Sequence, residues 1–249
     1  MAVIVTLDQI QHLAPNVRSS YRDAFQNGQA VLDQCGISET ALRVAHFMAQ
    51  VLHESGGLAI QIESLNYSAE RLPIVWPSRF KPKGPLDPAA FAHNQQKLGN
   101  EVYGGRMGNT GPNDGFTYRG RGLLQLTGKD SYREATDALR AQNPAAPDFV
   151  ALPDAVFSGQ WCLAVAAAEW LSKGCNAFAD QDDIRKVTRA INGGLIGLSD
   201  RLEWLRLTKA VWLPAAAPLA VSGPVGTARR PAPKGRRPRK ARKRARKRK

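Results

Sequence analysis

Cysteine is scarce in this sequence, and other features that would assign a protein class directly are missing. Three cysteines, Cys35, Cys162 and Cys175, occur among 249 residues at spacings unlike those of metal sites. A small odd number in a chain of this size argues against a disulfide framework, so we expect buried free thiols and leave a Cys162–Cys175 pair open. No apolar run approaches the roughly 18 residues that a membrane-spanning helix needs.

Acidic residues are absent from the end of the chain. Residues 229–249 contain 14 Lys or Arg and no Asp or Glu, whereas residues 1–228 carry 21 basic and 21 acidic residues. The net charge of +14 therefore belongs to the last residues and does not make the rest a nucleic-acid binder. Because 229–249 also lacks aromatic residues, we expect a disordered polybasic tail, after a Pro/Ala/Gly linker at 214–228 and a folded domain at 1–213.

Apolar residues recur at helical spacing through most of 1–213, and we expect a mainly α-helical domain with long loops and a small β element. The clearest helix ends near Glu54. Apolar positions between Leu42 and Leu52 cover most of its circumference, which predicts a buried helix. The other expected helices lie within 5–35, at 66–72, weakly at 87–99, from about 129 to 142, and at 154–173, 181–191 and 199–212.

Two carboxylates follow one another at the end of the buried helix. Glu54 precedes Gly56-Gly57, and Glu63 lies nine residues after Glu54. On one continuous helix the two would face opposite sides over about 13.5 Å, whereas a turn at the glycines lets the chain fold back. The helix C-terminus and a low dielectric disfavour the charged form of Glu54, which suits a general acid. Glu63, on the polar side of an alternating segment at 58–63, suits a general base.

A carboxylate pair of this kind is the minimum equipment for cleaving a glycosidic bond. Taken singly, Glu54 is also compatible with an ordinary helix-terminal charge, and Glu63 with a surface carboxylate. A second constellation lies at 120–128, where Gln125 and Thr127 alternate with leucines and would project from one side of an apolar strand towards a water or a sugar. Its glycine pattern matches no phosphate-binding motif.

Three further residues have plain structural interpretations. Asn192 precedes Gly-Gly and fits a helix C-cap, and Arg201 fits a salt bridge with Asp200 or Glu203. His53 fits a packed or hydrogen-bonded side chain better than a catalyst.

Four segments in order nevertheless carry a family resemblance. They are His53-Glu-Ser-Gly-Gly, Glu63-Ser-Leu-Asn-Tyr-Ser-Ala-Glu-Arg-Leu, Tyr118-Arg-Gly-Arg-Gly-Leu-Leu-Gln-Leu-Thr-Gly, and Ile191-Asn-Gly-Gly followed by Asp200-Arg. Together they resemble the chitinase-like glycoside hydrolases of family 19, in particular the bacterial and phage endolysin (lysozyme) branch. The resemblance implies a lysozyme-like, two-lobed helical fold with a cleft. It also implies inverting hydrolysis of β-1,4 bonds to N-acetylglucosamine units.

The resemblance also assigns roles by position. Glu54 matches the general acid, Glu63 the general base, and Thr127 the residue that holds the attacking water. The positions matched to substrate binding or to the cleft wall are Gln125, Asn192, Arg201, Tyr67, Tyr132 and His53. Among these, Arg201 matches an arginine near the base.

The sequence therefore predicts a monomeric glycosidase of cell-wall glycans that needs no metal or other cofactor, with peptidoglycan favoured over chitin. The polybasic tail would bind anionic envelope polymers, with nucleic acid as the second choice. The N-terminus lacks a Sec-type signal, so we expect cytoplasmic synthesis followed by holin-type release or a dedicated secretion route. The alternative is a nucleic-acid- or envelope-binding protein with a catalytically vestigial hydrolase fold.

Overall fold

The computed structural model describes residues 1–213, and helices form nearly all of the regular structure in that part. The α-helices are α1 (Leu7–Leu13), α2 (Ser19–Gln26), α3 (Gln29–Gln34), α4 (Ala41–Glu54), α5 (Leu72–Val75), α6 (Gln95–Tyr103), α7 (Asp114–Thr117), α8 (Lys129–Gln142), α9 (Cys162–Ser172), α10 (Cys175–Asp180), α11 (Ile184–Asn192) and α12 (Leu198–Trp212). Within residues 1–213, no helix is long and apolar enough to cross a membrane. The predicted linker at 214–228 and tail at 229–249 lie outside the described residues.

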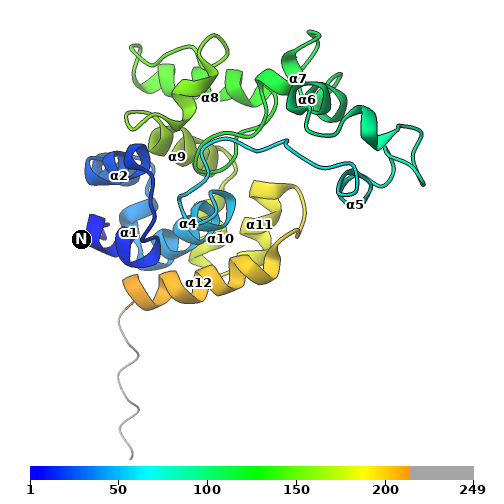
Figure 1. Cartoon of the computed structure of the whole chain (residues 1–249). Coiled ribbons are helices and arrows are strands. Elements are labelled where there is room, and N and C mark those ends of the chain that lie inside the picture. Colours follow the sequence, from blue (N-terminus) through cyan, green and yellow to red (C-terminus); the bar gives the residue numbers. More distant parts are fainter. Residues whose placement is uncertain (214–249) are drawn as a thin grey trace, which may run out of the picture. The chain divides into compact units, whose positions relative to one another are not determined.

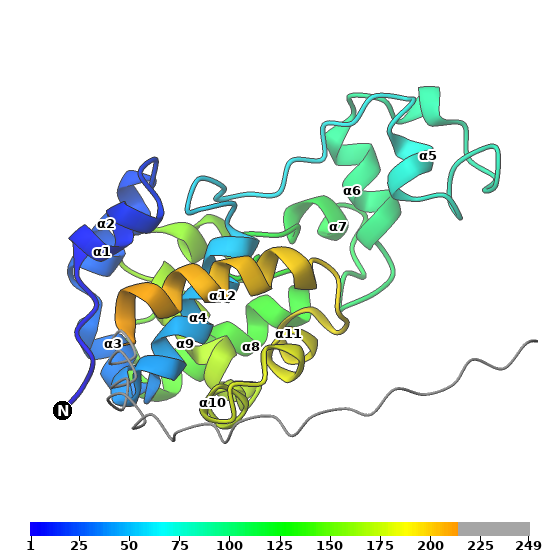
Figure 2. The same cartoon turned by 90° about the horizontal axis from the view of Figure 1, so that it is seen from below.

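The helix α4 lies at the centre of the main core, as its apolar circumference predicts. Its N-cap Thr40 accepts a hydrogen bond from the Arg43 amide at 3.1 Å, and every residue from 44 to 52 is buried. α12 packs along α4, and the Thr208 hydroxyl donates to the Ala45 carbonyl at 2.9 Å (Figure 2). Because α4 is packed tightly, the group at its C-terminal end has a well-defined position.

The apolar side chains gather in separate clusters. The largest surrounds α4 and includes side chains from α1, α2, α3, α9 and α12, a second lies between α8 and α9, and a third lies within the segment 65–116 with α5 and α6. In Figures 1 and 2, α5 and α6 lie to one side of the helices around α4. This arrangement agrees with the predicted mainly helical, two-lobed fold.

The chain turns directly after α4, as the glycine pair predicts. Gly56 and Gly57 have φ values of +55° and +67°, which glycine adopts without steric cost, and the Gly57 amide donates to the Leu52 carbonyl at 2.7 Å. The following residues do not form the predicted alternating strand. Leu58 is fully buried with φ +62°, whereas Ile60 is exposed, so the two do not share a face.

The small β element consists of isolated bridges rather than strands in the described part of the chain. Ile62 pairs with Arg121, and Arg121 also pairs with Leu126. The Glu63 amide donates to the Gly120 carbonyl at 2.8 Å, so the residues after α4 run beside residues 120–122. The predicted apolar strand at 124–127 is instead a tight turn, because Gln125 has a positive φ of +53°.

Several other elements differ from the sequence prediction. α10 was not expected, since six residues are too few to show helical periodicity. The helix expected at 66–72 begins only at Leu72, and the one expected at 87–99 is α6, which begins at Gln95. Cys35, Cys162 and Cys175 are buried free thiols, as expected, and the Cys162–Cys175 pair does not form.

Candidate active site

A cleft of about 600 Å³ contains most of the predicted site residues. This volume is within the usual range for ligand sites, about 300–1,000 Å³. The predicted residues that line the cleft are His53, Glu54, Glu63, Gln125, Thr127 and Asn192. They come from the ends of α4 and α11 and from two loops, so segments far apart in the sequence form one cavity.

Glu54 is the last residue of α4, and its carboxylate is held by Arg201 of α12. The Arg201 guanidinium donates to Glu54 Oε1 and to Gln50 Oε1, and only 2% of its side chain is exposed, against 18% for Glu54. The salt-bridge interpretation of Arg201 is therefore wrong, because its partner is the proposed acid Glu54 and neither Asp200 nor Glu203. A buried arginine of this kind orients the carboxylate and does not itself face the cleft.

Glu63 is held from the opposite wall by two donors. The Tyr103 hydroxyl donates to Oε1 at 2.7 Å, and the Gly120 amide donates to Oε2 at 3.3 Å. Burial and the charge of Glu63 raise the pKa of Tyr103, so this hydroxyl keeps its proton and remains a donor. The predicted contrast in burial is not seen, since Glu54 and Glu63 are both half-buried.

Thr127 and Gln125 meet Glu63 around Gly120. A Cβ atom at Gly120 would lie 2.9 Å from Gln125 Oε1, 3.3 Å from Glu63 Cβ and 3.4 Å from Thr127 Oγ1. A side chain at this position would therefore fill the cleft. The Thr127 hydroxyl donates to the Gln125 carbonyl at 2.8 Å, which leaves its lone pairs to accept a hydrogen bond from a water. The turn at 122–125 thus brings both side chains to the cleft without the predicted strand.

Asn192 and His53 lie at helix ends on the remaining wall. Asn192 is the last residue of α11, and the C-cap is Gly193 with φ +71°. His53 Nδ1 pairs with Asp200 Oδ2 of α12, which agrees with the interpretation of His53 as a hydrogen-bonded residue. The C-cap interpretation of Asn192 is therefore wrong by one residue, whereas the hydrogen-bonded interpretation of His53 holds, and both side chains line the cavity.

The two tyrosines expected in the cleft wall do not line the cavity. Tyr132 is fully buried, and its hydroxyl donates to the Arg119 carbonyl at 2.8 Å and accepts from Arg121 at 3.0 Å. Tyr67 packs edge-on against Trp76 with ring centroids 5.1 Å apart, in the cluster of the α5–α6 lobe. The Tyr132 ring packs in the core between α8 and α9, and its hydroxyl bonds to the segment 119–121.

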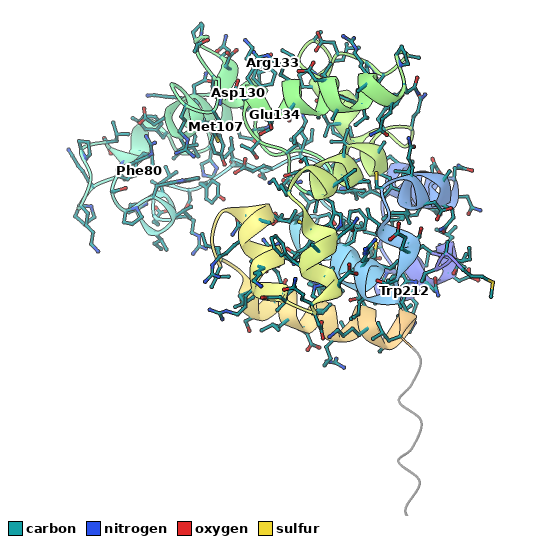
Figure 3. All side chains as sticks on the ribbon, turned by 180° about the vertical axis from the view of Figure 1, so that it is seen from behind. Phe80, Met107, Asp130, Arg133, Glu134 and Trp212 are labelled. Carbon is teal, nitrogen blue, oxygen red and sulfur yellow. The ribbon has the colours of Figure 1, made fainter. Side chains whose placement is uncertain are left out.

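Sequence reasoning did not name eight of the residues that line the cleft, and the ones with the most chemical interest among them are Tyr103, Met107, Glu169 and Lys173. Figure 3 shows Met107 near the start of α8, where the Asp130 amide donates to its carbonyl at 3.1 Å. Glu169 accepts a hydrogen bond from Lys173 Nζ at 2.8 Å, and burial raises the pKa of its carboxyl group. Glu169 is the one acidic residue in the apolar helix α9, and this isolated charge could have identified it as a candidate site residue.

The described residues were also searched for side chains that could bind a metal ion together. Among residues 1–213, no three His, Cys, Asp or Glu side chains converge closely enough to hold an ion. The geometry offers instead two carboxylates on one cavity, each oriented by its own donors, with a hydroxyl beside one of them.

Comparison with known proteins finds similar chains by sequence and by fold. No family model matches the chain. A protein of Haemophilus influenzae described as a glycosyl hydrolase family 19 domain-containing protein is 36% identical over 187 residues, which cover 74% of this chain and 87% of that protein. A bacterial family 19 chitinase superposes with a TM-score of 0.54 at 22% identity, covering 84% of this chain and 95% of its own. Chitinase C from Streptomyces griseus gives 0.55 at 18% identity, covering 85% and 93%.

Proposed function

The chain belongs to glycosyl hydrolase family 19 and has the fold of family 19 chitinases, and on that premise we propose that it is an inverting glycosidase of cell-wall peptidoglycan. We also propose that it is an endolysin-type enzyme, which cleaves β-1,4 bonds next to N-acetylglucosamine units. The observation that carries it is the carboxylate pair Glu54 and Glu63, which line the same 600 Å³ cleft and are held by different elements.

The proposed mechanism assigns one proton transfer to each carboxyl group. Glu54 gives its proton to the glycosidic oxygen as the bond from that oxygen to the anomeric carbon breaks, and the Arg201 guanidinium stabilises the carboxylate that this step leaves. A water attacks the same carbon from the opposite face and gives a proton to Glu63, while Thr127 accepts a hydrogen bond from this water. Inverting enzymes keep their two carboxyl groups about 6.5–9.5 Å apart to leave room for the water.

Arg201 and Tyr103 would act as positioning residues for this chemistry. Arg201 holds the Glu54 carboxyl from within the protein, and Tyr103 holds Glu63 by a hydrogen bond. Fixing both groups before the substrate arrives lowers the entropic part of the barrier. Neither residue exchanges a proton in the proposed cycle.

Peptidoglycan is preferred to chitin because of the charge at the end of the chain. Residues 229–249 carry 14 basic residues, and bacterial envelopes are anionic, whereas chitin is uncharged. A role in wall lysis also requires passage out of the cytoplasm, for which we propose holin-type release or a dedicated secretion route.

The decisive experiment compares the wild type with Glu54→Gln on two substrates. The readouts are turbidity loss of outer-membrane-permeabilised cells and product release from chitin oligomers. We expect Glu54→Gln to lower the rate at least about a hundredfold, because a general acid typically contributes that much. Glu203→Gln is the matched control, since Glu203 is an exposed partner of Arg206 on α12.

Two outcomes would contradict the proposal. If the wild type lyses no cells and cleaves no oligomer, the vestigial-fold alternative is favoured. If Glu54→Gln and Glu203→Gln retain equal activity, Glu54 is not the acid. Proton NMR of the fresh product adds a test of stereochemistry, since an inverting enzyme acting on a β-linkage first releases the α-anomer.

A further inference from the structure

A second cavity of about 210 Å³ lies between α8 and α9 and is here called the α8–α9 groove. Residues at helical spacing on one face of each helix form its walls. The residues that matter here are Ser131, Ala135, Ala138, Val165, Ala168 and Glu169. Of the ten residues that line the groove, five are apolar and five are polar or charged, Glu134 and Ser172 among them, so the groove has both apolar and polar walls.

The groove shares three lining residues with the catalytic cleft. Ser131, Glu169 and Lys173 line both cavities. Ser131 is near the start of α8, and Glu169 and Lys173 are at the end of α9, so the shared end is where these two helix termini meet (Figure 1). A ligand that occupies the cleft and carries a branch can therefore extend the branch between α8 and α9.

The residues that line both cavities also have hydrogen-bonding groups without a partner within residues 1–213. Glu169 Oε1 accepts from Lys173, but Glu169 Oε2 is buried and has no partner among the described residues. A buried acceptor without a partner is costly, and a donor on a ligand would remove that cost. The Lys173 ammonium donates to Glu169 and to the Ile191 carbonyl at 3.1 Å, which uses two of its three N–H groups.

We propose that the α8–α9 groove binds the peptide branch of peptidoglycan. This inference rests on the proposed function and deepens it, because chitin is unbranched and has nothing to place in the groove. Peptide amides supply N–H donors for Glu169 Oε2, small side chains fit against Ala135 and Ala138, and a peptide carboxylate accepts from Lys173. At roughly 30 Å³ per water molecule, the groove has the volume of about seven waters, enough for the first part of such a branch.

The test uses two substrates that differ only in the branch. One is purified glycan strands with their peptides, and the other is the same strands after an amidase has removed the peptides. The variant Ala138→Leu fills the groove, and the matched control Asp137→Leu places the same side chain at the exposed neighbouring position of α8. Glu169→Gln is a second variant that removes the charge of the acceptor and keeps its shape.

The quantity measured is the ratio of kcat/KM for the branched strands to kcat/KM for the stripped strands. We expect the wild type and Asp137→Leu to share a ratio well above one. We expect Ala138→Leu and Glu169→Gln to lower it at least about tenfold, mainly through KM. A ratio that neither variant changes would overturn the groove assignment and leave the glycosidase proposal standing. Cleavage of neither substrate by the wild type would overturn both.

Discussion

At the scale of single residues, each proposed catalytic carboxylate depends on a partner distant in sequence. Glu54 and Arg201 are 147 positions apart, and Glu63 and Tyr103 are 40 positions apart. Glutamates next to turn-forming glycines are visible in the sequence, so the pair itself could be predicted. The partners could not, because a lone Tyr or Arg at the end or start of a helix has many possible neighbours.

Tyr103→Phe tests the role of the hydroxyl at the proposed base. The change removes one hydrogen bond to a carboxylate, a contact that contributes about 1.5–3 kcal/mol, so we expect kcat to fall between about tenfold and a hundredfold. Steady-state kinetics on chitin oligomers measures this. Tyr118→Phe is the matched control, since the Tyr118 hydroxyl donates to the Val150 carbonyl and Tyr118 does not line the cleft. Equal kcat values for the two variants would remove Tyr103 from the positioning of Glu63.

At the scale of elements, helix ends supply much of the cleft. α4 ends at Glu54 and α11 ends at Asn192, while α12 provides Arg201 in its first turn. Apolar residues around most of its circumference made α4 predictable. The segment at 58–63 was wrongly predicted as a strand, since alternation over six residues is too short to outweigh the left-handed turn that the glycines begin.

Arg201→Met tests whether the contacts of Arg201 with α4 stabilise the packing of α12 against α4. The change removes two hydrogen bonds made by a charged group, to Glu54 and to the buried Gln50, and we expect the free energy of unfolding to fall by about 3–6 kcal/mol. Arg206→Met is the control on the same helix, because its pair with Glu203 is exposed and should contribute at most about 1 kcal/mol. Urea denaturation followed by circular dichroism measures both. Similar losses for the two variants would show that Arg201 does not anchor α4.

At the scale of the whole molecule, charge and catalytic groups are separated along the chain. The cleft is formed within residues 1–213, whereas the entire net charge of +14 is accounted for by residues 229–249. We therefore predict two separable activities, glycan hydrolysis by the described domain and attraction to polyanions by the basic end.

Deleting residues 214–249 tests this separation. We expect cleavage of short neutral oligomers to be unchanged, while binding to anionic envelope polymers weakens and loses most of its dependence on salt. The reason is that counterion release scales with the number of neutralised charges. Co-sedimentation with cell envelopes at increasing salt measures the binding, and duplex DNA serves as a second polyanion. Undiminished, salt-sensitive envelope binding by the shortened chain would locate the attraction in the domain instead.

The sequence by itself determined the helical class, the buried helix that ends at Glu54, the reversal at the glycines and six of the residues that line the cleft. These features follow from short-range periodicity and turn chemistry, which a few neighbouring residues encode. Only the tertiary structure decided that Arg201 and Tyr103 hold the carboxylates, that Tyr132 is buried, and that Glu169 lines both the cleft and the α8–α9 groove. Such contacts depend on how whole helices pack, and no local pattern specifies which side chains then meet.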